Sequence, residues 1–240
     1  MKFLKTSGLF LATTLILASC GNNQETVETT DAQEVGEAVG TTLQINTAES
    51  TVNWRGYKPT GQHYGIIPIT SGEIMVDADQ VTGGRFVFDI TKLEVHDLEA
   101  GSDSHGKLTG HLQSEDFFDA SNHPEAIFEI TAVEAFAAGD SLENKEEFAT
   151  ENTPKSASEQ AVSNPTHWVS GNLTMRGTTK NIKFPAAISV SNGSATAQAG
   201  FNIDRTQWGL MYGDEAGAVN KAQDQFIYNT VSVGFDVKAN

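Results

Sequence analysis

The chain contains one tetrapeptide that could mark a catalytic serine. Gly139-Asp140-Ser141-Leu142 matches the motif around the nucleophile of a group of lipases and esterases. That serine needs a rigid strand-to-helix turn and a positioned histidine and aspartate. Here it lies in a loop-like stretch of a strand-rich chain, and no Gly-x-Ser-x-Gly elbow is present. We therefore reject a hydrolase and predict a protein that is not an enzyme.

A second group of residues has the types that bind metals. Neither His-x-His nor His-Glu-x-x-His occurs in it, so no pair has a spacing that by itself orients two imidazoles on one ion. Two interpretations stay open: a weakly bound divalent ion at a barrel rim, and a solvated loop with a helix cap, which we favour. The group comprises His96, Asp97, Glu99, Asp103, His105 and His111.

The single cysteine, Cys20, ends the pattern Leu17-Ala18-Ser19-Cys20. Before it come Lys2, Lys5 and an apolar run over 9–17, which is too short for a membrane-spanning helix. This is the pattern of a bacterial lipoprotein signal, in which the cysteine is acylated and becomes the new N-terminus. The alternative is an ordinary secreted protein cut near Ala18. As an anchor, Cys20 leaves no thiol for a disulfide, a metal thiolate or a nucleophile.

The charge of the chain argues against an anionic partner. The formal net charge is −16, and it becomes −18 without residues 1–19, which hold two lysines and no acids. Such a chain repels phosphate backbones and anionic headgroups. We therefore expect no nucleic acid as partner, and membrane association only through the acyl anchor, at the bacterial cell envelope on the periplasmic or outer-membrane side.

Composition divides the chain into a leader, a tether and one domain. Residues 1–19 are the predicted signal peptide, and 20–42 are the lipidated cysteine and a flexible acidic tether with too little apolar surface to offset its ordering entropy. Residues 43–238 form the domain, interrupted by a long polar loop over 139–165.

Most of the domain alternates apolar and polar residues at period two, with glycine, asparagine, aspartate and proline between the runs. Examples are Phe86-x-Phe88-x-Ile90 and Val231-x-Val233-x-Phe235. Eight or nine such runs predict an all-β, antiparallel barrel or sandwich. Leu108 and Leu112 stand at helical spacing and predict one short helix within 102–118.

Three blocks of sequence indicate a family. They begin at Gly110 (GHLQSEDFFDASNHPEAIFEI), Val169 (VSGNLTMRGTTKNIKF) and Phe201 (FNIDRTQWG), and in this order they resemble the YceI-like family of bacterial periplasmic proteins. The resemblance covers roughly 43–238. It implies a lipocalin-like antiparallel barrel of about eight strands, whose interior holds an isoprenoid chain such as that of a quinone.

The blocks also have a structural interpretation of their own. Met175-Arg176-Gly177-Thr178 predicts a tight hairpin turn in which Gly177 takes a positive φ. Asp204-Arg205 suggests an ion pair at a strand end. Of the adjacent Phe117 and Phe118, one is expected to seal the barrel end and the other to line its mouth.

We predict a lipid-binding set of aromatic side chains, because apolar sites are lined by such groups with few polar ones. A filled core is the alternative, and with it an adaptor or stress-related protein that contacts protein partners through its outer surface. No cofactor beyond a bound isoprenoid lipid or quinone is expected. The set is Trp54, Phe86, Phe88, Phe117, Phe128, Phe184 and Phe201.

Overall fold

A computed structural model describes residues 23–136, 143–146, 150–154, 161–218 and 226–240. Cys20, the predicted signal peptide and Gly139–Leu142 lie outside these residues. Within the described ranges, no helix is both long and apolar enough to cross a membrane.

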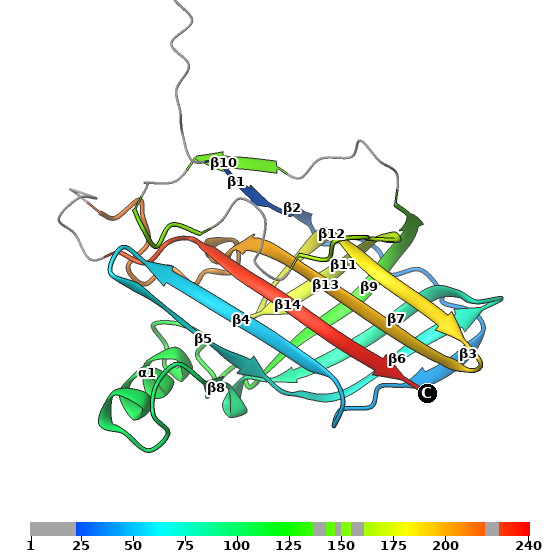
Figure 1. The fold of residues 1–240 in the computed structure, drawn as a ribbon, viewed down its shortest axis with the longest axis horizontal. Coiled ribbons are helices and arrows are strands. Elements are labelled where there is room, and N and C mark those ends of the chain that lie inside the picture. The colour runs from blue at the N-terminus through cyan, green and yellow to red at the C-terminus, as the bar shows by residue number, and fades with distance from the viewer. Residues whose placement is uncertain (1–22, 137–142, 147–149, 155–160, 219–225) are drawn as a thin grey trace, which may run out of the picture.

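The structure is dominated by one antiparallel sheet of twelve strands that curls on itself (Figure 1). Its order is β3-β6-β7-β9-β11-β12-β13-β14-β4-β5-β8, and β2 joins it beside β12. Two further strands, β1 (Asn23–Thr26) and β10 (Glu143–Glu146), pair with each other. The twelve are β2 (Glu28–Asp31), β3 (Thr41–Gln44), β4 (Thr51–Lys58), β5 (Gly61–Ile67), β6 (Ile69–Asp77), β7 (Gln80–Asp89), β8 (Glu94–Val95), β9 (Glu125–Ala135), β11 (His167–Met175), β12 (Thr178–Ser191), β13 (Ser194–Asp204) and β14 (Thr230–Ala239).

The wall of the barrel consists of strands side by side, and at two places in it the wall is formed by two shorter strands arranged end to end. β14 pairs with β4 over Val231–Asp236, and beyond it Gln44 and Asn240 exchange backbone hydrogen bonds of 2.9 and 3.0 Å. β3 and β4 are therefore two parts of one interrupted strand. β5 and β6 lie along the next position, separated by Pro68 alone. The long strands thus form a barrel with eight positions, and the predicted fold class is confirmed.

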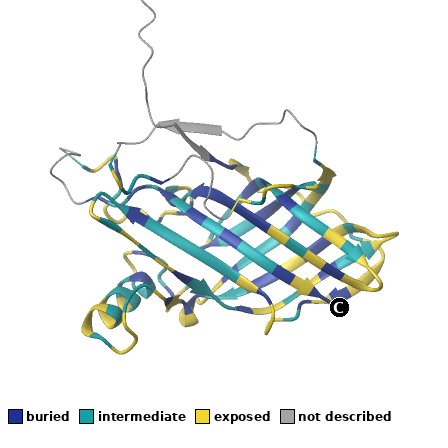
Figure 2. Ribbon diagram, in the orientation of Figure 1, coloured by how far each residue is buried: buried dark blue, intermediate teal, exposed yellow. Residues whose placement is uncertain are grey.

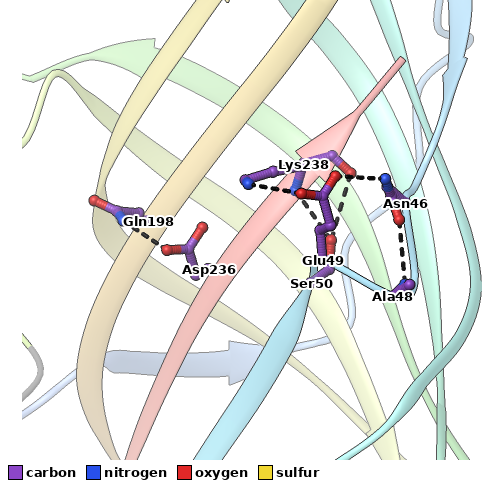
Figure 3. A network of polar contacts seen from close by, with 7 residues as sticks. All are labelled: Asn46, Ala48, Glu49, Ser50, Gln198, Asp236 and Lys238. Atoms are coloured by element: carbon purple, nitrogen blue, oxygen red, sulfur yellow. Dashed lines mark hydrogen bonds and ion pairs between the residues drawn. The ribbon is translucent and has the colours of Figure 1, made fainter.

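The interruption between β3 and β4 is fixed to β14 by side chains (Figure 3). Ser50 Oγ accepts the Lys238 N–H at 3.0 Å, and the Lys238 ammonium meets Glu49 at 3.2 Å. Asn46 donates to the other oxygen of Glu49 at 2.7 Å. These contacts hold the short bulge against β14, so the wall stays continuous where the strand breaks.

Helices and turns agree with the local sequence signals. The predicted short helix is α1 (Asp103–Gln113), which begins after Ser102, whose hydroxyl accepts the His105 N–H at 3.2 Å. Figure 1 shows it beside β5 and β8. Two 3-10 turns, η1 (Ile90–Lys92) and η2 (Arg205–Trp208), follow β7 and β13.

The predicted turn between β11 and β12 is confirmed. Arg176 has a φ of 47° and Gly177 one of 73°, as a two-residue hairpin turn of primed type requires. The Arg176 guanidinium also donates to the carbonyls of Glu115, Phe117 and Gly209 at 2.6 to 3.0 Å. The turn is therefore fixed to two other segments, the one that follows α1 and the one that follows η2.

The predicted flexible tether is wrong for residues 26–42: Thr41 and Thr42 belong to β3 of the wall, and we call residues 26–40 the strap. The strap lies along the outside of the barrel: β2 pairs with β12, and Thr82 of β7 donates to the Val39 carbonyl at 2.6 Å. Asn172 of β11 bonds both the N–H and the carbonyl of Gln33, at 2.9 and 2.7 Å. The prediction failed because it counted only apolar burial, whereas the strap is held mainly by backbone and amide hydrogen bonds.

Candidate ligand-binding cavity

The barrel encloses an apolar cavity of about 140 Å³. Side chains from the long strands line it, and most residues along these strands are buried or half-buried (Figure 2). Among the described residues that line the cavity, none is ionisable, and the only polar ones are Asn53 and Thr196. The cavity therefore offers shape and apolar contact, with no group placed for acid–base chemistry.

Aromatic rings form a chain around this interior. The Phe86 and Phe128 rings lie 6.3 Å apart, and Phe128 lies 5.7 Å from Phe184. Phe184 stacks on Phe201 with centroids 4.3 Å apart and planes 14° apart. Phe235 closes the chain with its edge toward Phe184, at 5.6 Å. The chain joins β7, β9, β12, β13 and β14, so one slender ligand can contact rings from several strands.

The volume of the cavity limits the size of the ligand that fits without movement of the lining side chains. An engineered apolar cavity of about 150 Å³ stays dry and binds one benzene molecule. A cavity of 140 Å³ therefore accepts a slender apolar group of that size. A longer chain requires the lining side chains to move apart or part of the chain to remain outside.

Six of the seven predicted lipid-binding residues line the cavity: Trp54, Phe86, Phe88, Phe128, Phe184 and Phe201. Their contact with a lipid stays a prediction. The analysis of the sequence missed Phe235, although it stands two residues after Val233 in an alternating run and so faces the same side.

Phe117 is not among the lining residues. Its ring instead packs against His111 at 5.1 Å and Tyr212 at 5.5 Å, and the Arg205 guanidinium lies 5.9 Å from it. The residue follows α1 in a turn, so the alternation of a strand does not fix its direction. Its predicted place in the lipid-binding set is therefore not supported by the geometry.

Arg205 is buried, and its side chain contacts differ from the suggested ion pair. The guanidinium donates to the carbonyls of Leu210, Ile227 and Tyr228. The Asp204 carboxylate accepts the Thr206 N–H at 3.0 Å and so caps η2. Burial lowers the pKa of Arg205, and the nearby carboxylates of Asp204, Asp214 and Glu215 oppose that shift. Arg205 thus organises the loop after β13.

Two histidines of the candidate metal group, His96 and His111, contact different carboxylates, and Asp97 of the group contacts His63, which lies outside it. His96 meets Glu94 at 2.8 Å and His111 meets Asp116 at 3.3 Å. His63 meets Asp97 at 2.7 Å; burial raises the pKa of Asp97, but hydrogen bonds from the Tyr64 N–H and His63 outweigh it and lower the pKa. Among the described residues, no three His, Cys, Asp or Glu side chains gather closely enough to hold a metal.

Comparison with known proteins identifies the family. The model of the YceI-like domain matches residues 43–239, and the chain belongs to this family. Burkholderia cenocepacia BcnA is similar in structure, with 16% identity and a TM-score of 0.55 over 82% of this chain and 99% of that one. A domain from Saccharophagus degradans, described as polyisoprenoid binding and implicated in plant cell wall breakdown, has 14% identity and a TM-score of 0.52 over 82% and 97%. No curated protein matches the chain.

Proposed function

We propose that this protein binds an apolar, isoprenoid-type lipid inside its barrel, at the bacterial cell envelope, and catalyses no reaction. The observation that carries the proposal is an interior cavity with no ionisable side chain, lined by aromatic rings from five strands. An isoprenoid chain needs only length and apolar contact, which such a cavity supplies. The polyisoprenoid-binding domain of similar fold supports the same ligand class.

The proposal includes a quinone as the kind of isoprenoid carried. A quinone joins an apolar chain to a flat ring of low charge, and the cavity can surround either part with aromatic faces. Since Asn53 and Thr196 are the only polar lining residues, recognition rests on shape and burial more than on hydrogen bonds.

The anchor at Cys20 belongs to the same proposal. Seven residue steps separate Cys20 from Val27, which is fixed on the barrel, so the two lie at most about 25 Å apart. An acylated Cys20 would hold the cavity close to the bilayer that contains its ligand, and capture would become local.

A titration with a decyl-chain quinone tests the function. Trp54 lines the cavity, so bound quinone is expected to quench its fluorescence. Ala186→Phe adds a ring inside the cavity and is expected to weaken binding at least tenfold. Ala187→Phe is the matched control, because it adds the same ring on the outward side of the same strand.

Saturable quenching by the wild type and by Ala187→Phe, with loss in Ala186→Phe, supports the proposal. Trp54→Phe should abolish most of the quenching while the quinone still co-purifies with the protein. A wild type that takes up no quinone would sink the proposal and favour an adaptor with a filled interior.

A further inference from the structure

The wall of the barrel has a seam between β12 and β13. These strands pair with each other only from Ala186 to Ser191 on β12. By contrast, β13 pairs with β14 along its length, from Ala195 to Asp204. Extending the β12–β13 register would place Lys183 opposite Asn202, but no such pairing occurs. We call the part of the wall where β12 and β13 do not pair with each other, 180–183 of β12 and 202–204 of β13, the seam.

The strap fills the seam from outside. β2 pairs antiparallel with β12, with Glu28 opposite Lys183 and Asp31 opposite Lys180. On the other side, the Val27 N–H donates to the Asn202 carbonyl of β13 at 2.9 Å. The strap thus bridges two strands that do not bond each other there, and Figure 1 shows β2 beside β12.

The cavity lies directly behind the seam. Ile182 and Phe184 of β12 and Ile203 of β13 line it, as does Phe201. The stacked rings of Phe184 and Phe201 come from opposite sides of the seam, so they close it from inside. This ring pair and the side chains of Ile182 and Ile203 therefore lie between the cavity and the strap.

The strap buries little apolar surface along its length. One apolar side chain, Val27, is 1% exposed and belongs to the core, whereas Val35 is 45% exposed. Beyond the four-residue pairing of β2, the strap gains the two Gln33–Asn172 hydrogen bonds and an exposed ion pair of Asp31 with Lys180 at 2.9 Å. Segments with little apolar burial open locally at lower cost than long central strands.

We propose that the ligand enters and leaves through this seam, and that residues Val27–Asp31 are the gate strand that opens it. The proposal rests on the proposed function, since it needs an apolar ligand in the cavity. A slender isoprenoid chain suits the route, because release of one short strand and rotation of two rings opens a path without breaking a long strand pair. The gate strand is also the segment that leads to Cys20, so an anchored protein would present its seam close to the membrane.

A reversible disulfide across the gate tests the proposal. Asp31 and Lys180 are directly opposite in register, which suits a disulfide between cysteines at these positions. The full chain carries Asp31→Cys and Lys180→Cys in a Cys20→Ser background, so only the designed thiols are present. The matched control is Gln198→Cys with Asp236→Cys, which are opposite each other on β13 and β14, away from the strap.

The readout is the rate at which decyl-chain quinone binds and leaves, followed by Trp54 quenching. We expect the oxidised gate variant to exchange quinone at least tenfold more slowly than the reduced form, and the control pair to show no difference. Equal rates in the oxidised and reduced gate variants would contradict entry through the seam, while the cavity would remain a binding site. Absence of quenching in every form overturns the proposed function, and the gate with it.

Discussion

The two sides of β12 meet different kinds of partner. On the inner side, Phe184 and Ala186 face an apolar cavity and are almost fully buried. On the outer side, Asn181 donates to Thr131 of β9 and to Asn172 of β11, and Lys183 forms an ion pair with Glu134 of β9. The inner side depends on excluding charge, whereas the outer side depends on pairing each polar group. A charge introduced on the inner side should therefore destabilise the fold far more than the same charge on the outer side.

The largest expected effect comes from placing a charge on the inner side. Phe184→Asp removes a buried ring and leaves a carboxylate facing a cavity with no ionisable partner. We expect it to lower the free energy of unfolding by more than about 4 kcal/mol. Ala187→Asp, on the outer side of the same strand, should cost about 1 kcal/mol or less. Chemical denaturation of both variants measures this, and equal losses would show that the two sides do not differ.

A smaller effect is expected where the strap uses apolar burial. Val27→Ala removes two methyl groups from the core cluster, worth about 1.5 kcal/mol. We expect amides of the strap to exchange hydrogen roughly tenfold faster, because 1.4 kcal/mol is a factor of ten. Val35→Ala, on the same strap but exposed, should leave exchange unchanged. If both variants accelerate exchange alike, Val27 does not fasten the strap.

The smallest effect is expected from the exposed ion pair. The hydrogen bond and the charge of Lys180 lower the pKa of Asp31 below its ordinary value of 3.8. The bound strap therefore favours the carboxylate: its contribution is present above pH 3.8 and is lost as the pH falls through the lowered pKa. Exposed pairs contribute little, so the change is modest.

Quinone release measured from pH 6 to pH 3 tests this pair. The wild type should release faster at the acid end, and Asp31→Asn should lack the part of the pH dependence that Asp31 supplies. Glu28, Lys183 and Glu134, the charged groups nearby on β2, β12 and β9, are present in both proteins, so the difference between the two isolates Asp31. If the wild type and Asp31→Asn show identical pH profiles, the ion pair does not help to hold the gate strand in place.

The sequence predicted the interior well, because the cavity wall follows from local alternation. Residues such as Phe86 and Phe88 share a face whenever the strand is regular, so their inward direction needs no long-range information. Phe117 was misplaced because it stands in a turn, where this rule does not apply. Its packing depends on Tyr212, which lies far along the chain.

The position of the strap could not be predicted from the local sequence. Gln33 and Asn172 are 139 residues apart, and nothing near Gln33 shows that its backbone will find that amide. Its binding also requires that β12 leave an unpaired edge, which follows from how β13 diverges. The run Val27-x-Thr29 alternates in the manner of a strand, and this is the one local signal that could have indicated β2.

The most direct test of the central claim is mass spectrometry of an organic extract of the full chain purified from bacterial cells, beside Ala186→Phe prepared in the same way. We predict a near-stoichiometric isoprenoid-class lipid in the wild-type extract and a strongly reduced amount in Ala186→Phe. A wild-type extract with no isoprenoid, from protein that also takes up none when it is added, would contradict the account.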